Sequence, residues 1–114
     1  MLTYTSHRKL DANMYYDKYS SRYYDVIITI MDNKVESITV SNKDDISLLP
    51  HINVFLSDDR QTITDTVISY TNLDISTSQR ESFEKYYDFA KTFVDKELKS
   101  FIQKEINTHK GVQN

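Results

Sequence analysis

The chain has 114 residues, a formal net charge of −3, no cysteine and one glycine, Gly111. Without cysteine it has no disulfides, thiolate nucleophiles or cysteine-based zinc sites. A lone glycine near the end excludes glycine-built phosphate loops and nucleophile elbows. The length and the aromatic content of 12% predict one folded domain spanning 1–114 rather than a disordered chain.

The charge balance and hydropathy bear on partners and compartment. Fourteen basic residues against 17 acidic ones lack the basic excess that is typical of proteins bound to nucleic-acid backbones. The longest apolar stretch, 26–31, is far shorter than a membrane span, and the N-terminus has no signal-peptide pattern. We therefore expect a cytoplasmic protein that contacts no membrane, and no motif calls for a cofactor.

The first of two predicted β-hairpins lies in 23–41. Segments 23–31 and 35–41 are rich in β-branched and aromatic residues and flank a polar turn at 32–34. Pairing Met31 with Val35 places apolar residues of both strands on one face. On this register Ile28 lies opposite Ile38, and Val26 lies opposite Val40.

The second predicted hairpin joins strands 51–56 and 61–70 through the turn 57–60. The first of these strands places its apolar residues Ile52, Val54 and Leu56 on one face. The second strand carries apolar residues on both faces, so its inward face stays open. The two sets are Ile63 with Val67, and Ile68 with Tyr70.

A long amphipathic helix is predicted over 78–110. It begins with a capping-box spacing at Ser78 and Glu81, and its apolar residues recur at steps of three and four. Gly111 suits the left-handed residue that ends many helices. We therefore expect one apolar stripe along the whole helix.

This helix is longer than a sheet of short strands. It would run about 46 Å, whereas such a sheet spans about 17–20 Å. We expect residues 83–94 to pack on the sheet and the end beyond Leu98 to be uncovered, unless the N-terminal segment folds back over it. The candidate oligomer contact at that end comprises Phe101, Ile102 and Ile106, through which the chain would form a homodimer.

The tyrosine-rich segment 1–22 forms either a short helix over about 6–20 or an irregular lead into the first strand. The predicted fold is therefore α+β: an antiparallel four-stranded meander over 23–70, covered on one face by the long C-terminal helix over 78–110, with a short N-terminal helix as one alternative. In size, mild acidity and a sheet between terminal helices, the chain is similar to many small inhibitors and anti-defence proteins of phages. That resemblance covers architecture only and assigns no residue a role.

No pattern marks a catalytic or metal site. His7, His51 and His109 lie in three different predicted elements without metal-ligand spacing. The acidic pairs Asp44–Asp45 and Asp58–Asp59 lie in predicted loops that lack a calcium-loop layout, and solvated turn residues explain them more simply. We therefore expect neither a catalytic residue nor a bound metal.

Six of the nine tyrosines lie within the first 24 residues. Neighbouring tyrosines cannot both be buried on one face, so we expect several to be exposed, as at protein interfaces. The alternative is that they cap the core with their hydroxyls in water. The candidate partner-binding residues are Tyr15, Tyr16, Tyr19, Tyr23, Tyr24, Asp44, Asp45, Asp58 and Asp59.

These observations favour a non-enzymatic protein-binding module that acts by stoichiometric occlusion of a partner surface, as a phage or mobile-element inhibitor would. Its acidic loops would meet a basic patch on the partner protein. The second hypothesis is a nucleic-acid accessory protein that stacks bases on the tyrosines beside Arg8 and Arg22. The third is a small enzyme with an unmarked site.

Overall fold

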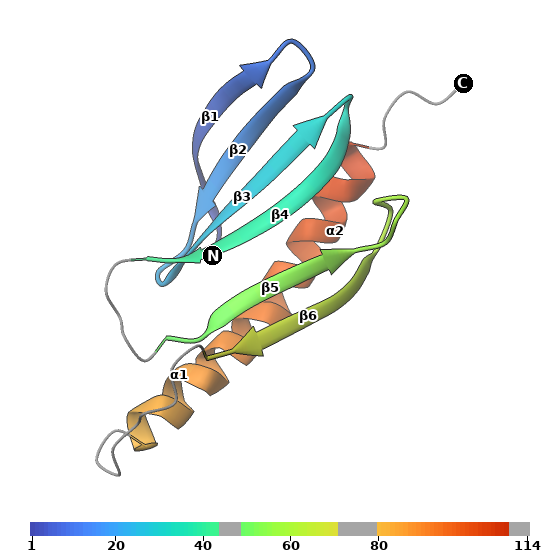
Figure 1. The fold of residues 1–114 in the computed structure, drawn as a ribbon. Helices are drawn as coiled ribbons and strands as arrows, with labels where there is room; N and C mark the ends of the chain where they lie inside the picture. The colour runs from blue at the N-terminus through green and yellow to red at the C-terminus, as the bar shows by residue number, and fades with distance from the viewer. Residues whose placement is uncertain (44–48, 71–79, 110–114) are drawn as a thin grey trace.

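The computed structural model describes residues 1–43, 49–70 and 80–109 (Figure 1). Strands β1 (Thr3–Asp11), β2 (Met14–Ser20), β3 (Tyr24–Met31) and β4 (Lys34–Asn42) form a four-stranded antiparallel sheet in that order. Strands β5 (His51–Leu56) and β6 (Ile63–Ser69) form a separate antiparallel pair. Helix α1 (Arg80–Phe93), a π-helical turn (Val94–Leu98) and α2 (Lys99–Thr108) follow as one continuous rod on one side of both sheets. The predicted α+β class and the long C-terminal helix are confirmed.

The N-terminal segment forms a β-hairpin, so the helix considered for it is wrong. Strands β1 and β2 pair around Ala12 and Asn13, and β2 continues the sheet by pairing with β3. Tyrosine favours strands, and alternation sends Tyr15 and Tyr16 to opposite faces. The four-stranded sheet is therefore β1–β4, and the second predicted hairpin stands beside it as its own pair.

The β3–β4 hairpin confirms the predicted core pairing and corrects its tip. Ile28 lies opposite Ile38 and Val26 opposite Val40, as predicted. A bulge at Glu36 then shifts the register, so Met31 faces Lys34 rather than Val35. The turn is thereby shortened to Asp32 and Asn33, whose φ values of 52° and 64° are those of the mirror-image turns that suit a twisted hairpin.

A second bulge settles which face of β6 points inward. Thr64 is the extra residue, because Phe55 pairs with Asp65 whereas Leu56 pairs with Ile63. The bulge reverses the alternation, so residues on both sides of it reach the same face. Ile63, Thr66 and Ile68 lie opposite Leu56, Val54 and Ile52, respectively.

One apolar core lies between the helix and both sheets. On the helix side, every fourth residue from Ala90 to Ile106 is fully buried. Such a spacing drifts around an α-helix, which has about 3.6 residues per turn, and the wider π-helical turn brings the stripe back toward the sheets. The buried helix residues are Ala90, Phe93, Val94, Leu98, Ile102 and Ile106.

The end of the helix beyond Leu98, which the sequence predicted to be uncovered, is covered in the structure. Ile102 and Ile106 are fully buried, and Phe101 packs edge to face on Tyr19 of β2 with ring centroids 4.7 Å apart. The N-terminal hairpin therefore covers this end, which is the alternative that the sequence left open. Ile102 and Ile106 are not exposed contacts for a second copy, and Phe101 is partly buried. By contrast, none of residues 80–89 is fully buried. The predicted cap at Ser78 and the stop at Gly111 lie outside the described residues.

Tyr24 links three parts of the fold and is the bulkiest fully buried side chain among the described residues. Its hydroxyl donates to the carbonyl oxygen of Pro50, just before β5, at 2.7 Å. Its ring stacks on Phe93 of α1 with centroids 5.4 Å apart and planes 10° from parallel. Burial raises the pKa of this phenol, which keeps it a neutral donor.

Removing this hydroxyl should destabilise the protein. Tyr24→Phe leaves the buried Pro50 carbonyl without its donor, at an expected cost of about 1–3 kcal/mol in the free energy of unfolding. Tyr24→Ala also removes the ring, and we expect it to cost about 3–5 kcal/mol. Urea unfolding measures both. The control is Tyr16→Phe on the outer face of β2, and a Tyr24→Phe protein as stable as that control would contradict the prediction.

Candidate protein-binding surface

The tyrosines proposed as one contact surface are divided between several environments. Tyr24 lies in the core, so its assignment as an exposed contact is wrong. Tyr15 and Tyr19 lie on the helix-facing side of β2, opposite Ile30 and Val26 of β3, whereas Tyr16 lies on the other face of the sheet. The structure therefore brings together no common platform of these residues on which a row of bases would stack.

Tyr15 and Tyr19 cap the edge of the core, as the alternative interpretation held. The Tyr19 ring lies between Tyr4 and Phe101, with centroid distances of 5.6 and 4.7 Å. Partial burial, and then the negative charge of Glu105, raise the pKa of Tyr19 to about 12. The Tyr15 ring lies 4.9 Å from that of His7, and burial raises its pKa as well.

Among the tyrosines predicted to bind a partner, Tyr23 is the one whose ring contacts residues 80–89 of α1, none of which is fully buried. It lies in the β2–β3 turn, and its ring meets Phe89 edge to face at 4.7 Å and Tyr86 at 6.0 Å. The guanidinium carbon of Arg22 lies 5.2 Å from the centroid of the same ring, within cation–π range. These contacts hold three aromatic rings and a cation on one flank of α1.

A second aromatic group lies on the β6 side of the same helix. The ring of Tyr70, directly after β6, lies 4.3 Å from Phe83 and 6.5 Å from Tyr87. Partial burial raises the pKa of Tyr70 to about 12. The two groups lie on opposite flanks of α1, because Tyr87 and Phe89 are two residues apart and so about 200° apart around the helix. We call them together the α1 aromatic surface, which comprises Tyr23, Tyr70, Phe83, Tyr86, Tyr87 and Phe89.

The α1 aromatic surface is accessible at its rim. Tyr87 and Phe89 each keep 38% of their surface exposed. A cavity of about 310 Å³ opens beside Phe83 and Tyr87, and Glu84 and Asp88 also line it. The sequence interpretation missed this surface because it assigned residues 83–94 to the packed part of the helix.

The acidic candidates stand apart from the aromatic ones. Asp58 and Asp59 lie in the β5–β6 turn, toward the opposite end of the molecule from the start of α1 (Figure 1). The Asp59 carboxylate accepts hydrogen bonds from the Ser57 hydroxyl and the Gln61 amide, which lower its pKa. These bonds are typical of a turn-forming residue. Asp44 and Asp45 lie outside the described residues.

The histidines pair with carboxylates one at a time. His7 Nδ1 lies 2.6 Å from the Asp17 carboxylate, and His109 Nε2 lies 3.5 Å from that of Glu105, while His51 is exposed on β5. Within residues 1–43, 49–70 and 80–109, no three His, Asp or Glu side chains converge in a way that would hold a metal ion.

No helix in the described part of the chain is both long enough and apolar enough to cross a membrane. No protein-family model, curated protein or solved structure matches the chain.

The raised tyrosine pKa values predict a loss of stability at alkaline pH. Tyr19 has a pKa of about 12 in the folded protein against 10.0 as its ordinary value. Its contribution to stability is therefore complete below pH 10 and is lost as the pH rises toward 12. Urea unfolding across this window should show a falling free energy of unfolding, with a smaller fall in Tyr19→Phe because that ring cannot ionise. Tyr16→Phe is the control and should keep the full fall; an equal fall in Tyr19→Phe would contradict the prediction.

Proposed function

We propose that the chain is a non-enzymatic protein-binding module that occludes a partner's functional surface in a one-to-one complex, as an inhibitor or adaptor does. The α1 aromatic surface is its contact region. The observation that supports this proposal is the exposure of Tyr87 and Phe89, 38% each, on a half-helix in which none of residues 80–89 is fully buried.

The composition of this surface suits binding. Tyrosine and arginine are enriched among the residues that dominate interface energies, because they combine a large apolar area with a polar tip. The rings of Tyr23, Tyr86 and Phe89 already restrain one another through edge-to-face contacts. Pre-ordered side chains lose less conformational entropy on binding, so more of their contact energy contributes to affinity.

The placement of α1 suits occlusion. The start of the helix extends beyond both sheets (Figure 1). A projecting amphipathic helix is one of the recurrent ways in which proteins fill a groove on a partner. Glu84 and Asp88, which line the cavity beside Tyr87, favour a partner groove with basic residues at its rim.

Removing the exposed rings should abolish binding without unfolding the protein. We expect a tagged chain to recover one protein from lysate of its native host at near-equal stoichiometry, with or without nuclease. The double variant Tyr87→Ser/Phe89→Ser should lower this recovery by at least about tenfold, as expected for the loss of hot-spot residues. Thermal unfolding followed by circular dichroism should show that the variant is folded.

Phe55→Ser is the matched control, because Phe55 is an aromatic residue of β5 that is 52% exposed outside the α1 aromatic surface. This variant should recover the partner as well as the original chain does. Equal loss in both variants, or undiminished recovery by the double variant, would contradict the proposed surface. Recovery that disappears with nuclease would favour the nucleic-acid hypothesis instead.

A further inference from the structure

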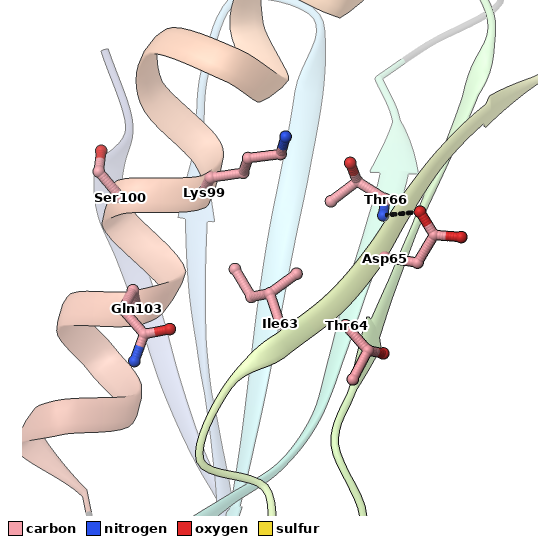
Figure 2. Close-up of a pocket in the computed structure, with 7 residues that line it drawn as sticks. All are labelled: Ile63, Thr64, Asp65, Thr66, Lys99, Ser100 and Gln103. Carbon is pink, nitrogen blue, oxygen red and sulfur yellow. Dashed lines mark hydrogen bonds between the residues drawn. The ribbon is translucent and has the colours of Figure 1, made fainter.

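Strand β6 presents a sheet edge beside the helix. Among the described residues β6 is hydrogen-bonded to β5 alone. A cavity of about 460 Å³ lies between β6 and α2, lined by Ile63, Thr64, Asp65 and Thr66 from the strand and by Lys99, Ser100 and Gln103 from the helix (Figure 2). An edge strand next to a helix is the geometry in which an extended peptide can add one more strand.

One backbone amide at this edge already donates a hydrogen bond to a side chain of the same strand. The Thr66 amide donates to the Asp65 carboxylate at 2.8 Å (Figure 2). Charged side chains on edge strands commonly oppose unwanted pairing of the strand with other chains. If the Asp65 carboxylate paired with a cationic group, it would no longer accept from the Thr66 amide. That amide could then donate to the backbone of an added strand.

We propose that the groove between β6 and α2 binds an extended, basic segment of another protein, which adds to the edge of β6 as a third strand. This site is separate from the α1 aromatic surface, so the two proposals are independent and are tested by different variants. The added strand pairs with the backbone of β6, and alternate side chains enter the cavity.

The two sides of the edge offer different chemistry to such a strand. Figure 2 shows Ile63 and Thr66 directed toward the helix, where Gln103 lies on the opposite wall, and Asp65 directed away from it. Side chains of an extended peptide alternate between the two faces of the sheet. Apolar or hydroxyl side chains therefore suit the cavity, and basic side chains suit the face that carries Asp65.

The charges favour a basic segment over a second copy of this chain. The Lys99 side chain extends from the helix toward β6, and its ammonium lies 3.3 Å from the Asp95 carboxylate (Figure 2). Asp65, on the other face of the strand, forms no ion pair within the described residues. If two β6 edges paired in the register that places Asp65 opposite Asp65, the two carboxylates would repel one another, which destabilises a sheet. A lysine or arginine on the added strand instead gives an opposite-charge pair.

Two matched peptides test this inference on the full chain. The probes are fluorescein-labelled eight-residue peptides, one alternating lysine with valine and the other alternating glutamate with valine. At low salt we expect the lysine peptide to bind at least about tenfold more tightly in fluorescence anisotropy, an order of magnitude that corresponds to about 1.4 kcal/mol. NMR amide shifts on titration should concentrate in β6 and α2.

Three variants separate the edge from a general charge effect. Asp65→Lys should reverse the order of the two peptides, whereas Asp58→Lys, which changes an exposed charge in the β5–β6 turn, should keep it. Thr66→Pro removes the edge amide and should abolish binding; if this variant does not fold, Asp65→Lys decides the matter alone. Equal binding of both peptides, no binding at millimolar concentration, shifts outside β6 and α2, or self-association of the original chain through β6 would overturn the proposal.

Discussion

The apolar stripe of the helix joins two sheets that share no hydrogen-bonded ladder. Strands β1–β4 and the β5–β6 pair are separate sheets, yet their inward side chains form one cluster with the helix. A two-stranded hairpin is at best marginally stable in water, so β5 and β6 depend on this burial to remain folded. Tyr24 strengthens the junction, because it hydrogen-bonds the chain just before β5 and stacks on Phe93 of α1.

This arrangement also explains which surfaces stay outside the core. One helix must cover two sheets, and its fully buried residues begin only at Ala90. The first turns of α1 therefore keep their aromatic side chains at the surface. The β5–β6 pair leaves one strand edge without a partner among the described residues. Both proposed contact regions follow from a core that the helix only partly covers.

The sequence predicted the elements better than their junctions. Periodicity located β3–β6 and the helix because these segments bury one face. The segment 1–22 was predicted as a short helix or an irregular lead because Leu10, Met14 and Tyr15 fit a helical stripe. The strand places Tyr15 and Tyr19 on one face, but residues four apart also share a face of a helix, so this spacing does not distinguish the two. The bulges at Glu36 and Thr64 were not predicted, because a bulge depends on how two strands fit together and leaves no mark in either strand alone.

The candidate site was harder to predict, since periodicity shows that a helix face is apolar but not what covers it. The two halves of the helix differ in composition: Phe83, Tyr86, Tyr87 and Phe89 precede Ala90, whereas Leu98, Ile102 and Ile106 follow it together with the aromatic residues Phe93 and Phe101. An aliphatic side chain gains nothing from water, whereas a tyrosine at a rim keeps its hydroxyl solvated while its ring is in contact. The structure buries Leu98, Ile102 and Ile106 completely, buries Phe93 almost completely and leaves Phe101 partly exposed. The larger share of aliphatic residues after Ala90 is therefore the signal in the sequence that favours burial of the end of the helix over burial of its start.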